Sequence, residues 1–134
     1  MAEKHEYLNA FINSSPTIVE KAAADIAAPA HKAVMYDSDG DVLTATSGDV
    51  AIGFILSSSP DPIKKGRQVH ILIKDIGLVE AGGEIKKGDL ITIDAAGQAV
   101  AADSDDFIFG RAFTSAGAAG EVIQAQINQM GYKA

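Results

Sequence analysis

The sequence contains no cysteine and no tryptophan among its 134 residues. The absence of cysteine excludes disulfide scaffolds, thiolate metal sites and cysteine nucleophiles. No apolar run approaches the about 20 residues of a transmembrane helix. The first residues, MAEKHEYLNAF, lack the long apolar stretch of a signal peptide. We therefore expect a soluble protein that is made in the cytoplasm and does not enter a membrane.

Basic residues are also scarce, with 11 Lys and Arg against 18 Asp and Glu and a net charge of −7. This balance argues against binding to nucleic acid or to an anionic membrane surface. Hydrophobic residues make up 47% of the chain, which lies within the globular range. A chain of this length and composition is suited to one domain with its own core.

From residue 30 onward, short apolar runs alternate with turns of Gly, Asp and Ser. Such runs, rich in β-branched and aromatic residues, are typical of strands. The chain from 30 to 134 therefore predicts a single, mostly β domain, with a small β-barrel or sandwich-like body. The eight expected strands are Val34–Tyr36, Asp41–Ala45, Val50–Leu56, Val69–Ile73, Leu90–Ile93, Gln98–Ala102, Phe107–Phe113 and Val122–Ile127.

Residues 1–29 have a different pattern and are predicted to form an extended N-terminal arm. Ser14-Ser15-Pro16 interrupts any helix that begins earlier. The Ala-rich segment Glu20–Ala28 is compatible with two turns of helix that end at Pro29. The arm thus contains at most a short helix.

An internal repeat relates about residues 33–73 to about residues 90–127. A shift of 57 positions aligns Ala33–Leu56 with Leu90–Phe113, and a gap of three residues extends the match. We expect two related four-strand units, each too small to bury a core alone, packed as one body. The identical pairs are Asp37/Asp94, Gly40/Gly97, Ala45/Ala102, Ser47/Ser104, Asp49/Asp106 and Gly53/Gly110.

The segment Asp37–Asp41 resembles a calcium loop because aspartates stand at its alternate positions. In the second copy only Asp94 and the glycine Gly97 are retained. Asp and Gly are the residues of a hairpin turn, in which Asp bonds to the backbone and Gly adopts φ > 0. We therefore interpret Asp37, Gly40, Asp94 and Gly97 as turn residues, and a metal site is the alternative. The repeated glycines Gly53 and Gly110 are also predicted to be turn residues.

No arrangement in the sequence predicts catalysis or a bound cofactor. The three histidines, His5, His31 and His70, lack the spacing of a zinc site. The chain has no G-x-S-x-G elbow and no glycine-rich phosphate loop. We expect a protein that is not an enzyme, with no cofactor and no metal. An enzyme or carrier domain is the alternative.

The second half, GGEIKKGDLITIDAAGQAVAADSDDFIFGRAFTSAGAAGEVIQAQI, resembles the head decoration (capsid cement) proteins of tailed bacteriophages. The similarity is one of turns and strands in a fixed order, and the repeat extends it to the first half. The matching positions are Gly88-Asp89, Asp94 with Gly97, Ala99–Ala102, Phe109-Gly110-Arg111-Ala112 and Gly120-Glu121.

This resemblance implies a structural virion protein that binds the outside of the phage head. It implies homotrimers seated at three-fold positions, with the major capsid protein as partner. The expected role is to stabilise contacts between capsid subunits in a particle whose proteins are made in the host cytoplasm. The alternative is a surface-displayed β-module that binds a small ligand or a glycan.

The arm carries four large apolar side chains close together, namely Tyr7, Leu8, Phe11 and Ile12. Apolar side chains outside a folded body need a surface that covers them. We predict that these residues contact the capsid or a sister subunit, while packing against the chain's own body is the alternative.

The turn interpretation predicts that the protein does not need metal for its stability. A chelator should leave the melting temperature unchanged, because the Asp37–Asp41 segment bonds to its own backbone. Thermal unfolding with and without the chelator measures this, and a fall of several degrees would support the calcium interpretation instead.

Overall fold

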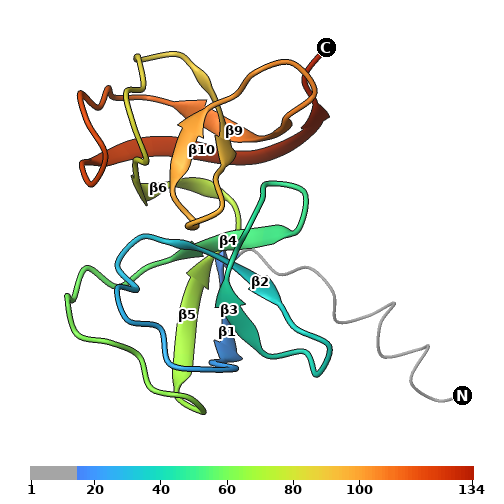
Figure 1. Ribbon diagram of the computed structural model, residues 1–134, viewed down its shortest axis with the longest axis vertical. Coiled ribbons are helices and arrows are strands. Elements are labelled where there is room, and N and C mark those ends of the chain that lie inside the picture. Colours follow the sequence, from blue (N-terminus) through green and yellow to red (C-terminus); the bar gives the residue numbers. More distant parts are fainter. Residues whose placement is uncertain (1–14) are drawn as a thin grey trace, which may run out of the picture.

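In a computed structural model, residues 15–134 are described, and they form ten strands and no helix. The strands make two units that follow one another in sequence and lie one above the other in Figure 1. The first unit contains β1 (Thr17–Lys21), β2 (Ala33–Tyr36), β3 (Val42–Thr44), β4 (Ala51–Ile55) and β5 (Gln68–Leu72). The second contains β6 (Asp75–Glu80), β7 (Leu90–Ile93), β8 (Ala99–Ala101), β9 (Phe107–Ala112) and β10 (Val122–Tyr132).

The two units have the same topology. The strand order is β1-β5-β4-β2-β3 in the first sheet and β6-β10-β9-β7-β8 in the second. All strand pairs within both sheets are antiparallel. The prediction of a mostly β fold is therefore confirmed, as two five-stranded sheets rather than a closed barrel. Each unit has five strands, so the prediction of four per unit was one short.

The N-terminal side of the first unit differs from the prediction. Thr17–Lys21 is a strand, not part of an arm, and it pairs with β5. The short helix with which Glu20–Ala28 is compatible does not form, because Ala22 and Ile26 form bridges to Val42 and Ile63. Both residues are buried at 4% exposure or less. Burial in the core therefore outweighs the weak helix propensity of a short Ala-rich run.

The second strand absent from the sequence prediction is β6. It occupies the place in the second sheet that β1 has in the first, because both pair with the last strand of their unit. Ile18 lies opposite Ile71, and Gly77 lies opposite Ala125, so Ile18 and Gly77 are equivalent positions. The structural repeat thus begins at β1, 16 residues before Ala33.

The first unit has a core of aliphatic side chains that lies on the inner face of its sheet. Its buried members are Ala22, Ile26, Val34, Val42, Ile55, Val69 and Ile71. The equivalent positions of the second unit are also buried. They are Ala81, Ile85, Ile91, Ala99, Ala112, Ile123 and Ala125.

The second core is larger because side chains from the opposite face of the first sheet join it. These are Ala33, Ala45, Ala51, Phe54 and Leu72. The Phe54 ring meets the Phe109 ring edge to face, with centroids 5.6 Å apart. Such a ring pair contributes about 0.5–1.5 kcal/mol beyond the area it buries. The back of the first sheet thus covers the core of the second unit.

The prediction that Gly53 and Gly110 are turn residues was wrong, because they lie inside strands β4 and β9. They are equivalent glycines at points where two strands approach closely. A Cβ at Gly53 would collide with the carbonyl oxygen of Leu72, and one at Gly110 with that of Gln126. Because the obstacle is backbone in both cases, a larger residue forces the strands apart.

We predict that Gly53→Ala and Gly110→Ala each lower the free energy of unfolding by about 1–3 kcal/mol, the usual cost of overpacking. Gly83→Ala is the matched control, since a Cβ there meets nothing within 4 Å. Denaturant unfolding measures all three variants. Equal stability of the two test variants and the control would contradict the close approach.

Candidate functional site

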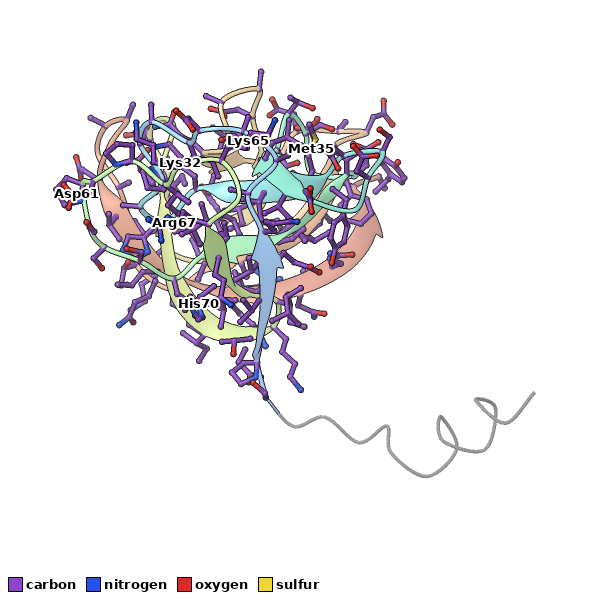
Figure 2. The ribbon with its side chains drawn as sticks, turned by 90° about the horizontal axis from the view of Figure 1, so that it is seen from below. Lys32, Met35, Asp61, Lys65, Arg67 and His70 are labelled. Carbon is purple, nitrogen blue, oxygen red and sulfur yellow. The ribbon has the colours of Figure 1, made fainter. Side chains whose placement is uncertain are left out.

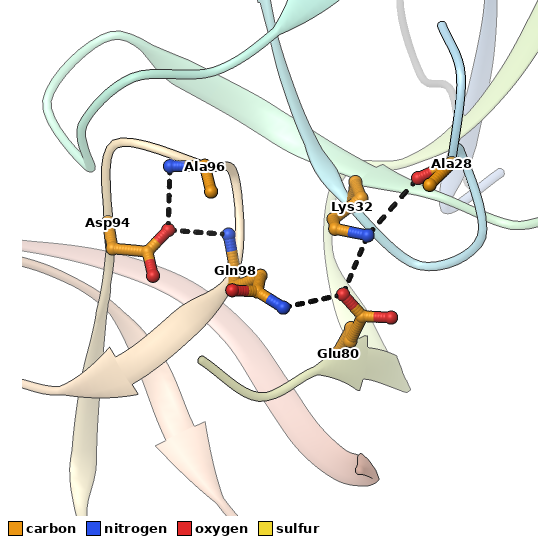
Figure 3. Close-up of polar contacts among 6 residues, drawn as sticks. All are labelled: Ala28, Lys32, Glu80, Asp94, Ala96 and Gln98. Atoms are coloured by element: carbon orange, nitrogen blue, oxygen red, sulfur yellow. Dashed lines mark hydrogen bonds and ion pairs between the residues drawn. The ribbon is translucent and has the colours of Figure 1, made fainter. Parts of the chain in front are cut away.

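The two hairpin turns have the same hydrogen bonds. Asp37 Oδ1 accepts hydrogen bonds from the N–H groups of Asp39 and Asp41, each at 2.9 Å. Asp94 Oδ1 accepts from Ala96 and Gln98 at the same distance, as Figure 3 shows. The glycines of the two turns, Gly40 and Gly97, have φ of +82° and +76°. Among residues 15–134, no group of three His, Cys, Asp or Glu side chains has the arrangement of a metal site.

The two turns differ in their surroundings. Gly97 lies against the first unit, where its carbonyl oxygen accepts a hydrogen bond of 2.8 Å from Ala33 N–H. A Cβ at Gly97 would lie 2.6 Å from a methyl carbon of Thr44, whereas one at Gly40 would meet nothing within 4 Å. The turn of the second unit is therefore an internal contact, and the turn of the first unit faces open space.

A polar cluster joins the two units beside the Gly97 turn (Figure 3). Lys32 Nζ lies 2.6 Å from Glu80 Oε2 and donates a hydrogen bond of 3.1 Å to the carbonyl of Ala28. Gln98 Nε2 donates to the same Glu80 oxygen at 2.7 Å. Both charged side chains are less than one-fifth exposed. This shielding strengthens their attraction relative to that of a surface pair.

His31 is buried next to this cluster, with 5% of its surface exposed. Its Nε2 lies 2.9 Å from Ser58 Oγ, and its carbonyl accepts a hydrogen bond from Glu80 N–H. Burial lowers the pKa of His31 below the ordinary 6.5, against smaller opposing effects of Ile55 and Glu80. The folded protein thus favours the neutral imidazole.

The second histidine of the described residues, His70, lies on another element. It is exposed on β5, and in the view of Figure 2 it lies below Arg67. His5 lies outside the described residues. The loop that carries Lys65 and Arg67 is held by Asp25, whose carboxylate accepts a hydrogen bond from Lys65 N–H and so has a lowered pKa.

Two open cavities occur on the described surface. One, of about 220 Å³, lies between the units and has three aspartates in its lining. The second, of about 260 Å³, borders the Lys32–Glu80 pair. The lining of the first consists of Ser47, Gly48, Asp49, Thr92, Ile93, Asp105, Asp106, Phe107 and Tyr132. Each lining contains one serine: Ser47 Oγ donates a hydrogen bond to Asp49 in the first, and Ser58 Oγ in the second lies 2.9 Å from His31 Nε2. Among the described residues His31 Nδ1 has no hydrogen-bond partner, so the Ser58–His31 pair lacks the third group that orients the base in a catalytic triad.

The most exposed aliphatic surface lies along β6, which is an edge strand of the second sheet. Ile76 is 58% exposed and Leu78 is 43% exposed, and Val122 on the neighbouring strand is 48% exposed. We call these three residues the β6 edge surface. An edge strand also presents unpaired backbone groups, so this surface is suited to contact another protein.

Sequence reasoning missed the β6 edge surface because it did not recognise β6 as a strand. The alternation in Asp75–Glu80 was the available signal, since Ile76 and Leu78 lie on one face and Val79 on the other. The predicted contact residues Tyr7, Leu8, Phe11 and Ile12 lie outside the described residues. Their role in binding remains a prediction.

Two similar β units with equivalent hairpin turns and an exposed apolar edge strand are typical of a structural protein that binds other proteins. Consistent with this, residues 9–128 match the family model of a structural cement protein (E217 gp24/Pam3 gp6). Because the match covers most of the chain, the protein belongs to this phage structural cement family. It is a structural protein of the phage head that binds the capsid and stabilises it, and this role is not enzymatic.

A solved structure has the same fold. It is described as the head fiber gp8.5 N base in bacteriophage phi29, and the TM-score is 0.59 at 22% sequence identity. The similarity covers 88% of this chain and 98% of the phi29 chain. At this identity the comparison concerns the fold alone. No curated protein matches the sequence.

The burial of neutral His31 predicts a loss of stability in mild acid. As the pH falls below 6.5, the unfolded chain takes up a proton more readily than the folded one, so the free energy of unfolding decreases. The loss continues until the pH reaches the lowered pKa of the folded state. His31→Asn should weaken this pH dependence, because asparagine tolerates the φ of +56° at this position and does not titrate.

Urea unfolding of both proteins at several pH values from about 7.5 to about 5, across the ordinary titration range of histidine, measures the effect. His5 and His70 are common to both proteins, so the difference isolates His31. An equal pH dependence in the variant would contradict the prediction.

Proposed function

We propose that the protein binds the outer face of the phage head as a homotrimer at three-fold positions and joins neighbouring major capsid subunits. In this position it would help the shell to resist the pressure of packaged DNA. The protein would be made in the host cytoplasm and assemble on the completed shell.

The observation that carries this proposal is the family match, which extends over 120 residues from 9 to 128. A small β body with an apolar edge strand supports it, because protein contacts need an apolar surface and free backbone groups. The same match favours a capsid role over a module for a small ligand or glycan.

We further propose that the first residues of the chain, with Tyr7, Leu8, Phe11 and Ile12, form a main attachment element. Burial of four such side chains contributes about 6–12 kcal/mol at 1.5–3 kcal/mol each. Ordering about ten residues of backbone costs about 10–20 kcal/mol. Attachment therefore also needs backbone hydrogen bonds to a partner strand and several linked copies at each site.

We predict that deletion of residues 2–15 leaves the melting curve of the body nearly unchanged and abolishes or greatly weakens head binding. The body keeps its strands because β1 begins at Thr17. The measurement is pelleting with undecorated heads, together with the number of copies bound per three-fold position.

Deletion of residues 2–6 is the matched control, since it shortens the chain and keeps the four apolar residues. It should pellet as the full chain does. Unfolding of the longer deletion would show that the segment belongs to the chain's own core. Undiminished binding would place the attachment on the body, with the β6 edge surface as the next region to test. Failure of the full chain to pellet would overturn the proposed function itself.

A further inference from the structure

Equivalent side chains at one end of the two cores differ in how deeply they are buried. In the second unit Phe109 and Ile127 are buried at 0% and 3% exposure. Their equivalents in the first unit, Ile52 and Ile73, are only partly buried, and so is Ile18. We call Ile18, Ile52 and Ile73 the open end of the first unit.

The second unit is closed at this end because the first unit covers it. Phe54 packs on Phe109, and Leu72 lies where a side chain at Gly77 would otherwise stand. Gly77 is the equivalent of Ile18, so the second unit leaves room there for a covering side chain. Within residues 15–134, no third unit covers the open end of the first.

The N-terminal segment leaves the body at the open end. The carbonyl of Pro16 accepts a hydrogen bond of 2.8 Å from Ile73 N–H, and β1 begins at the next residue. Pro16 is the equivalent of Asp75, since Asp75 lies opposite Ile127 in the second sheet. Residues before Pro16 therefore correspond in sequence to the part of the first unit that covers the second.

The chain cannot turn at Pro16 as it turns at Asp75. Asp75 has a φ of +69° at the junction of β5 and β6. The proline ring holds φ near −65°, about 130° away from that value. A proline at this position therefore does not reproduce the turn that leads from Leu72 into the second unit. An arm donated by an adjacent copy needs no such turn.

We propose that residues 7–12 of one copy cover the open end of a neighbouring copy on the head, so that the arms are exchanged between copies. This deepens the proposed function, on which it rests, by naming the acceptor of the arm. Thr17 is five residue steps from Ile12, and these steps span at most about 18 Å when the chain is extended. The donor's β1 must therefore lie close to the acceptor, as it does when copies share a symmetry axis.

The absence of cysteine makes a disulfide test direct. Phe11→Cys chains are mixed with Ile52→Cys chains on undecorated heads, oxidised mildly, and the joined peptides are identified by mass spectrometry. The matched control replaces Ile52→Cys by Val122→Cys, at a position that is 48% exposed on the second unit. Docking brings the two thiols to an effective concentration in the millimolar range, so we expect about ten-fold more of the Phe11–Ile52 product than of the control product.

Equal yields in the two mixtures, or no mixed product, would overturn the exchange. So would a disulfide that forms only within single chains of the Phe11→Cys/Ile52→Cys double variant. Ile73→Cys in place of Ile52→Cys guards against a variant that does not fold. Pelleting of the reduced proteins is measured in parallel, so normal pelleting without the mixed product overturns the exchange and leaves the proposed function standing.

Discussion

The contact of the first sheet's back with the second core is the interaction on which the rest of the structure depends. The units span residues 17–72 and 75–132, which is about 60 residues each, and a domain of this size buries only enough apolar surface to be marginally stable alone. Phe54 and Leu72 of the first sheet stabilise the second unit, because they pack into its core. The glycine at position 77 follows from the same contact, since it leaves room for the Leu72 side chain.

The two units have the same topology but make different contacts. The turn at Gly97 is an internal joint, and the equivalent turn at Gly40 is exposed. Lys32 and Glu80 bind the units together across the same joint, and the neighbouring His31 is kept neutral by burial. A repeat arranged head to tail in this way always leaves one end of one unit without its covering partner. This is the physical origin of the open end.

A structural cement protein acts by binding, so it requires a rigid body with a contact surface rather than a catalytic site. The described body has ten strands, and both of its Asp–Gly turns hydrogen-bond to their own backbone. Two of its exposed aliphatic residues, Ile76 and Leu78, lie on an edge strand, where backbone groups are also available to a partner. Attachment by several weak contacts on a symmetric shell multiplies modest single affinities, so a small body suffices.

The sequence by itself determined the strand-and-turn pattern, because Asp, Gly and β-branched residues act locally. The eight predicted strands, the repeat of Asp37 and Asp94, and the phage head family all come from such patterns. Only the tertiary structure decided the roles of β1 and β6. The sequence does not show that these strands are equivalent, because their side chains differ. Ile18 packs against the core of its own unit, whereas the Leu72 side chain occupies the space beside Gly77. The structure also decided that Ala22 and Ile26 are core residues and not helix, because their partners Val42 and Ile63 are distant in the chain. Local helix propensity does not depend on such distant partners. The free energy gained by burial against them exceeds the helix propensity of the short Ala-rich segment.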